Sequence, residues 1–331
     1  MTTRNEILQR MKERILILDG AAGTYLRHLN LGEEDFRGER LGHHPVSLKG
    51  CCDVLCLTRP DIVRQMHEAY IDAGADIVET NSFNANRLSL ADYGLEDLAY
   101  EISRAAAAVA REACGRRADR RVWVAGSMGP TNRRVSASPH GDGKDGSGVS
   151  LGQLRAAYYD QARGLVDGGA DLILVETLCD LLHAEAALKA VGDLAETLGH
   201  EIPVMCSATL DAVSGRMPWG PSVEEYCAAL APAGLLAIGL NCGCGARQLL
   251  PWIRRLSRMA GCPVSVHPSA GLPNVSGGYD ETPEGFAAVA RQAFEERLVN
   301  IYGGCCGTTP EHIRAVARLA GQYRPREIGE E

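Results

Sequence analysis

Two adjacent cysteines, Cys305 and Cys306, lie in the glycine-rich stretch Val299–His312, which reads VNIYGGCCGTTPEH. Neighbouring residues of a packed strand point to opposite faces, so the glycines predict a bent backbone that aims both thiols at one point. A third thiol, Cys242, follows another apolar run, and Cys244 is a second candidate for the same place. Three thiolates that face one point are typical of a zinc site, with a fourth position left open for a substrate.

Thiolate ligands suit a zinc ion that binds one more soft ligand, because sulfur donors weaken its acidity toward water. A substrate thiol bound to such an ion loses its proton near neutral pH and stays nucleophilic. The pattern therefore predicts a thiol substrate that attacks carbon. A second adjacent pair, Cys51 and Cys52, has no third cysteine partner in the sequence, and we interpret the two as plain thiols.

Acidic residues follow directly after apolar runs at Asp19 and Glu176. Two carboxylates near a thiol site could hold an ammonium group, and the backbone N–H groups of the turn at Gly20 and Ala21 could hold a carboxylate. Together they predict an amino acid that carries a thiol. Further polar residues at the ends of apolar runs complete the predicted substrate site: Glu79, Asn81, Ser127 and Asn241. His267 also ends such a run, but no partner is evident for it, and we expect a structural role.

Eight short apolar runs alternate with helical patterns along the chain. Continuous apolar runs are typical of strands buried on both faces, as in parallel sheets. Eight strictly alternating units favour a closed (β/α)8 TIM barrel over an open doubly wound sheet, and a barrel gathers the carboxyl ends of its strands at one rim. The runs are 15–20, 75–81, 122–127, 171–177, 203–209, 235–241, 263–269 and 299–304.

The composition is that of a single large domain. The chain has 331 residues, 45% of them hydrophobic, and a net charge of -8 without a run of Lys or Arg, which argues against nucleic acid and anionic membranes as partners. The polar N-terminus and the lack of a long apolar stretch predict a cytoplasmic protein. Within one domain at 1–331 we expect an N-terminal helix at 1–14, a mobile loop at 138–150 and a tail or linker at 324–331.

These residues resemble the zinc- and homocysteine-dependent S-methyltransferases, and most closely the N-terminal homocysteine-binding module of cobalamin-dependent methionine synthase. GLNC with GGCCG marks the wider family, whereas EEDFRGE and the AGLPN and GGYD stretches resemble the methionine synthase branch. The resemblance implies that Cys242, Cys305 and Cys306 bind zinc, and that Asp19 and Glu176 hold the amino acid end of homocysteine. It also implies that the homocysteine thiolate attacks a methyl group to give methionine.

The expected methyl donor is methylcobalamin on another module or subunit, and a methyltetrahydrofolate-binding module is a further candidate partner. One alternative is a cobalamin-independent enzyme that uses betaine or S-methylmethionine. Another is a non-catalytic zinc or redox-sensing barrel. The sequence departs from the family at HPNAG, where Ser269 replaces the asparagine and becomes the candidate fourth zinc contact. Where the family usually has KGNND this sequence has KGCCD, and where the family has GLNCALG it has GLNCGCG.

Overall fold

The computed structural model describes residues 2–117, 119–135 and 148–328. Within these residues, eight parallel strands form one sheet in the order β1-β8-β7-β6-β5-β4-β3-β2. A bridge between Leu18 and Ile77 joins the two outer strands, so the sheet closes into the predicted (β/α)8 barrel and the open sheet is excluded. The strands are β1 (Leu16–Ile17), β2 (Ile77–Glu79), β3 (Trp123–Met128), β4 (Leu172–Leu178), β5 (Val204–Ala208), β6 (Ala237–Gly245), β7 (Val264–Ser269) and β8 (Ile301–Tyr302).

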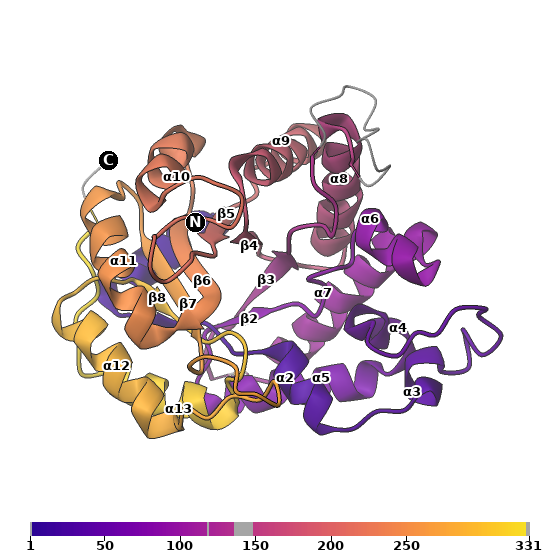
Figure 1. Cartoon of the computed structure of the whole chain (residues 1–331), viewed down its shortest axis with the longest axis horizontal. Helices are drawn as coiled ribbons and strands as arrows, with labels where there is room; N and C mark the ends of the chain where they lie inside the picture. The colour runs from indigo at the N-terminus through magenta and orange to yellow at the C-terminus, as the bar shows by residue number, and fades with distance from the viewer. Residues whose placement is uncertain (1, 118, 136–147, 329–331) are drawn as a thin grey trace.

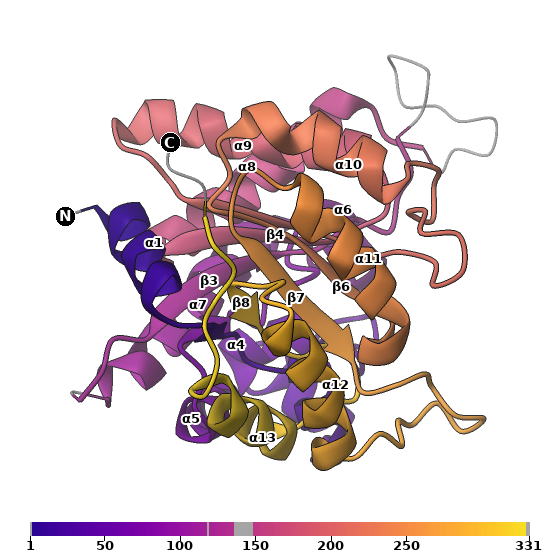
Figure 2. The ribbon, with the colours of Figure 1, turned by 90° about the vertical axis from the view of Figure 1, so that its left-hand side faces the viewer.

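Helices surround the strands (Figure 1). The helices that follow the eight strands in turn are α5 (Pro60–Ala73), α7 (Ala99–Gly115), α8 (Leu151–Asp167), α9 (Leu181–Leu198), α10 (Val223–Leu230), α11 (Ala246–Met259), α12 (Pro283–Glu295) and α13 (Pro310–Ala320). Short helices lie in the first two connections: α2 (Ala22–His28), α3 (Glu33–Arg37), α4 (Leu55–Thr58) and α6 (Arg87–Leu90). Helix α1 (Thr3–Glu13) lies at one end of the strands, and the loops after β5 and β7 extend from the opposite end (Figure 2).

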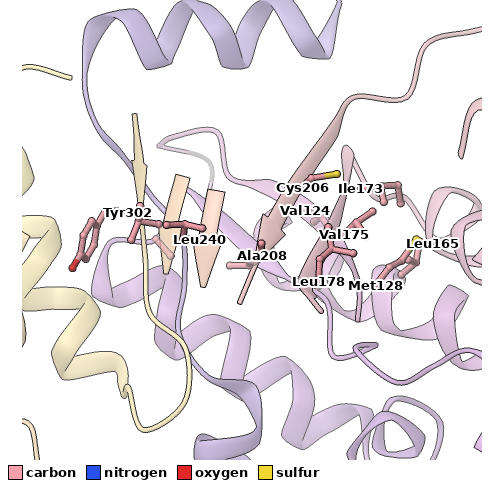
Figure 3. Close-up of a cluster of buried hydrophobic side chains, with 14 of the residues drawn as sticks. Val124, Met128, Leu165, Ile173, Val175, Leu178, Cys206, Ala208, Leu240 and Tyr302 are labelled. Carbon is pink, nitrogen blue, oxygen red and sulfur yellow. The ribbon is translucent and has the colours of Figure 1, made fainter. Parts of the chain in front are cut away.

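The strands are buried on both faces, which explains their continuous apolar sequences. In β4, Leu172 and Leu174 belong to the cluster inside the barrel, whereas Ile173 and Val175 belong to the cluster between strands and helices. Figure 3 shows part of this outer cluster, including Leu165 of α8. Successive side chains of a strand point to opposite faces, so a two-sided core needs an apolar residue at every position.

A polar residue before three of the strands ties each of them to a neighbouring strand. Asp76 donates its N–H to Ile17 O (2.7 Å), and its carboxylate accepts the Ile17 N–H (2.9 Å). The same two bonds join Asp171 to Val124 at 2.8 Å each, and Asn300 repeats the arrangement before β8. We call each such pair of hydrogen bonds a clamp. The Asp residues of two clamps, Asp76 and Asp171, are those of the matching sequences GADIVET and GADLILVET. The clamps fix the register between neighbouring strands and so bring the strand ends together.

The described part of the expected tail runs along the barrel. Arg326 donates its N–H to Val299 O (3.0 Å), and Asn300 donates its side-chain amide to Arg326 O (2.8 Å). Residues 329–331 of that tail, and most of the loop expected at 138–150, lie outside the described residues. In the part of the chain that the structure describes, no helix combines the length and the apolar character needed to cross a membrane.

We expect Asp76→Ala to lower the free energy of unfolding by about 3 kcal/mol, because it leaves the buried Ile17 N–H unpaired and removes the anion that faces Arg14 and Arg120. Asp72→Ala is the control, since this carboxylate is 59% exposed and pairs with an arginine only at the surface. It should cost less than about 1 kcal/mol. Urea unfolding measures both, and equal losses would contradict the clamp.

Candidate active site

Three thiols meet at the ends of β6 and β8. The Sγ atoms of Cys242, Cys305 and Cys306 all lie within 4.8 Å of one another, and those of Cys242 and Cys306 are 3.6 Å apart. All three are free thiols. A tetrahedral zinc ion with Zn–S bonds of about 2.3 Å places its sulfur ligands about 3.8 Å apart. The donors and their spacing therefore fit a zinc ion that keeps one further ligand position.

The end of β6 is bent so that one of its two cysteines faces the pair. Cys242 and Gly243 both adopt left-handed backbone angles, with φ of 54° and 67°, where the register with β7 shifts. Gly243 leaves no space for a side chain, because a Cβ there would lie 2.5 Å from Thr209 Oγ1. The bend turns Cys242 toward the thiol cluster and packs Cys244 into the core, where burial raises its pKa to about 11.

The adjacent pair lies in a turn that begins after β8 ends at Tyr302. Cys305 donates its N–H to Pro268 O (2.8 Å), which anchors the turn to β7. Gly307 has φ of 83°, and a Cβ there would lie 2.3 Å from the Tyr279 ring. Because the backbone leaves the strand before the thiols, both can point to the same side, and Tyr279 packs directly against the turn that holds them.

The thiols share their protons. Hydrogen bonds from Cys242 and Cys305 lower the pKa of Cys306, and the hydrogen bond to Cys242 raises that of Cys305 well above its usual range. A cluster of this kind carries negative charge near neutral pH, which suits a cation. Ser269, expected as a fourth contact, is 3% exposed and has its Oγ 3.9 Å from Cys242 Sγ, beside the cluster.

Buried acidic residues form a second cluster at the same end of the barrel. Ligand atoms of Glu79, Glu176 and His267 lie within 4.8 Å of one another. Ser127 donates its hydroxyl to Glu176 Oε1 (2.5 Å), and Asp19 accepts the backbone N–H of Glu79 with both carboxylate oxygens (3.1 Å each). The structure thus brings together four of the predicted substrate residues, namely Asp19, Glu79, Ser127 and Glu176.

Among the described residues, no Lys or Arg side chain pairs with these carboxyl groups. Burial raises the pKa of Glu79 to about 8, and burial together with Glu79 raises the pKa of Glu176 to about 8, with Cys306 adding to the rise. Burial and Glu79 also raise the pKa of Asp19 well above its usual range. A cationic ligand would favour the ionised forms and reverse these shifts. The cluster is therefore suited to bind a positively charged group next to the thiols.

The turn after β1, whose N–H groups were predicted to hold a carboxylate, is closely packed. Ala21 donates its N–H to Thr308 Oγ1 (3.2 Å), so this amide already has a partner. At Gly20 a Cβ would lie 2.8 Å from both Thr308 Oγ1 and the Tyr70 ring. Close packing against the turn that carries Cys305 and Cys306 therefore requires a glycine at position 20, independently of any contact between Gly20 and the substrate.

The side chain of Asn81 bonds to the segment that carries Cys52 and Cys56. Its side-chain amide donates to Cys52 O (2.8 Å) and lies 3.6 Å from Cys56 Sγ, so it fixes the segment before α4. Cys51 is 3% exposed in the core, and Cys52 is half-buried. Among the described residues, neither belongs to a group of side chains that could hold a metal ion.

Asn241 belongs to a buried chain of hydrogen bonds across four strands. It bonds to the N–H and Oγ1 of Thr177 (2.9 and 2.7 Å) and accepts the Ser207 hydroxyl (2.8 Å), which lies 3.0 Å from His267 Nε2. Thr177 follows Glu176 and has φ of 56°. The sequence placed Asn241 and His267 at strand ends, but their partners depend on the register of β4 to β7.

The sequence of residues 16–320 matches the family model described as Homocysteine S-methyltransferase. The chain belongs to the homocysteine S-methyltransferase family. This confirms the resemblance to the wider family, and it identifies the chain as a methyltransferase with homocysteine as methyl acceptor.

Two solved structures of the homocysteine methyltransferase MmuM from Escherichia coli are similar to this member of the family. The metallated form has 22% sequence identity and a TM-score of 0.71, with 96% of this chain and 99% of that chain covered. The oxidized form has 23% identity and a TM-score of 0.67, with 92% and 95% covered. At this identity the likeness shows a shared fold over nearly the whole of both chains.

We expect Cys305→Ala to remove most of the bound zinc while the barrel stays folded, because the thiols lie at a rim and the apolar core lies below them. Cys52→Ala changes a half-buried thiol outside the cluster and should keep about one zinc per chain. Metal analysis after dialysis, with circular dichroism as the folding check, compares the two variants. Full zinc content in Cys305→Ala would exclude this thiol as a ligand.

We expect Glu176→Gln to stabilise the metal-free protein at pH 8 and to leave it unchanged at pH 4. The pKa of Glu176 rises from 4.5 to about 8 on folding, so between these values the folded state holds a proton that the unfolded chain releases, and stability falls as pH rises. Glutamine does not ionise. The gain at pH 8 should be about 1–3 kcal/mol.

Urea unfolding at pH 4, 6 and 8 measures this gain. The exposed Glu284→Gln on α12 is the control, and any difference that it makes should be smaller than that of Glu176→Gln, because an exposed charge contributes little to stability. A difference for Glu176→Gln that stays constant with pH would contradict the raised pKa.

Proposed function

We propose that this protein activates homocysteine at a zinc ion held by Cys242, Cys305 and Cys306, and transfers a methyl group to its sulfur to give methionine. The observation that carries the proposal is the group of three free thiols within 4.8 Å of one another, near carboxyl groups whose pKa values are raised to about 8 by burial. A zinc ion bound there would take the thiol of homocysteine as a thiolate in its open position.

In this proposal the protein holds homocysteine at its thiol end and at its amino end. Glu79 and Glu176 would hold the amino group, and Asp19 fixes Glu79 by accepting its backbone N–H. The thiol gives up its proton on binding, its sulfur forms a bond to the methyl carbon, and the donor leaves with the electron pair of the broken bond. Ser269 lies close enough to the thiols to contact the metal when the substrate is absent.

The proposed methyl donor is methylcobalamin carried by another module or subunit. Its support is the resemblance of EEDFRGE and of the AGLPN and GGYD stretches to the methionine synthase branch. The GGYD stretch contains Tyr279, which packs against the turn that holds Cys305 and Cys306. A methyltetrahydrofolate-binding module would supply the methyl group to the cobalamin in turn.

The zinc-loaded protein, incubated with homocysteine and free methylcobalamin, should form methionine. Cys242→Ser should lose both zinc and activity, because a serine hydroxyl is a poor zinc ligand at neutral pH. Cys244→Ser is the matched control two residues away, and it should keep both, since Cys244 is packed in the core. Mass spectrometry of the product and metal analysis of each variant provide the two measurements.

Two other outcomes would change the assignment. Methionine formed from betaine or S-methylmethionine, and none from methylcobalamin, would make this a cobalamin-independent enzyme. Bound zinc with no methionine from any of the three donors, and no binding of homocysteine, would favour a non-catalytic zinc or redox-sensing barrel.

A further inference from the structure

The protons of the buried chain next to the acidic cluster can be assigned from the hydrogen bonds alone. A backbone N–H can only donate, so the Asn241 atom that lies 2.9 Å from Thr177 N must be the amide oxygen. The amide nitrogen of Asn241 then donates to Thr177 Oγ1 at 2.7 Å. This leaves no freedom in the orientation of the Asn241 side chain.

The orientation of Asn241 determines the next bond. Ser207 Oγ lies 2.8 Å from Asn241 Oδ1, and an amide oxygen only accepts, so the serine hydroxyl must donate its one hydrogen there. Ser207 Oγ can then only accept from His267 Nε2, which lies 3.0 Å away. His267 must therefore carry a proton on Nε2.

The other ring nitrogen of His267 is left as an acceptor. The side chain is fully buried, which disfavours the charged ring, and in the neutral ring a proton on Nε2 leaves the free lone pair on Nδ1. Nδ1 lies 3.2 Å from Glu79 Oε1, but the two atoms form no hydrogen bond, and within the described part of the chain neither has another hydrogen-bond partner. Burial raises the pKa of Glu79 to about 8, and a cationic ligand would favour its ionised form. In that form two acceptors face each other, and the ligand must supply the donor between them.

We propose that His267, Glu79 and Glu176 form a three-acceptor site for the ammonium group of the substrate, in which His267 accepts one N–H through Nδ1. An ammonium group has three N–H donors, and one acceptor atom from each of these side chains lies within 4.8 Å of the others. Glu176 uses Oε1 to accept from Ser127, which leaves Oε2 for the ligand. This inference rests on the proposed function, because it requires an amino acid substrate.

His267 thereby becomes a binding residue, and Asn241 and Ser207 become positioning residues. They hold the imidazole in the one tautomer that presents a lone pair to the ligand. The opposite tautomer would place an N–H toward the ammonium group and repel it. The predicted substrate role of Asn241 would then be indirect, through His267.

Two substitutions of His267 test the acceptor Nδ1 separately from the hydrogen bond between Nε2 and Ser207. In His267→Gln, the amide at the end of the side chain can still donate to Ser207, but nothing replaces Nδ1. In His267→Asn, the amide oxygen can take the place of Nδ1, while the bond to Ser207 is lost. Calorimetry on the zinc-loaded proteins should show homocysteine binding weakened at least about tenfold in His267→Gln, and clearly less in His267→Asn.

The deaminated analogue 4-mercaptobutanoate is the matched ligand, because it keeps the thiol and the carboxylate and lacks the ammonium group. Its affinity should be the same for wild type and His267→Gln. An equal loss for both ligands, or an equal loss in both variants, would overturn the proposal. Two metal ions per wild-type chain, with one lost in His267→Gln, would instead make the cluster a metal site and overturn it too.

Nitrogen-15 NMR of the wild-type protein with labelled histidine tests directly whether His267 carries its proton on Nε2. This measurement is made on the wild-type protein and does not depend on how well a variant binds. The His267 signal, identified by its absence from His267→Gln, should show a protonated Nε2 and a bare Nδ1. A proton on Nδ1 would overturn the assignment. If wild type binds homocysteine and His267→Gln binds it equally well, only this inference fails. If zinc-loaded wild type does not bind homocysteine, the proposed function fails with it.

Discussion

The arrangement of the site depends on the buried amide of Asn241. Thr177 and Cys242 both adopt left-handed backbone angles, which cost a residue other than glycine roughly 1–3 kcal/mol each. Asn241 precedes Cys242 in β6 and bonds to both the N–H and the hydroxyl of Thr177 in β4, so it offsets part of this cost. Because Glu176 precedes Thr177, the same amide links the positions of an acidic residue and a thiol.

Much of the fold could be predicted because each strand can be recognised from its own short stretch of sequence. A strand buried on both faces must be apolar at every position, and eight such runs in alternation with helices leave few architectures. The clamps at Asp76, Asp171 and Asn300 were less evident, since a polar residue before a strand looks the same whether it faces water or a neighbouring strand.

The site could be predicted in part for the same reason. Residues that end strands of a barrel meet at one rim, so Cys242 was placed with Cys305 and Cys306 from position alone. Side-chain direction could not be predicted in this way. Asn81 lies two residues after β2, and its side chain bonds to Cys52. The partner of His267 depends on the register of the neighbouring strands. The choice between Cys242 and Cys244 likewise depends on a bulge in β6.

The central claim is that three protein thiols leave one position on a zinc ion for the thiol of homocysteine. X-ray absorption at the zinc edge counts the sulfur atoms bound to the metal and can be recorded before and after homocysteine is added. The account predicts about three sulfur ligands without substrate and about four with it. A sulfur count that stays the same when homocysteine binds would contradict it.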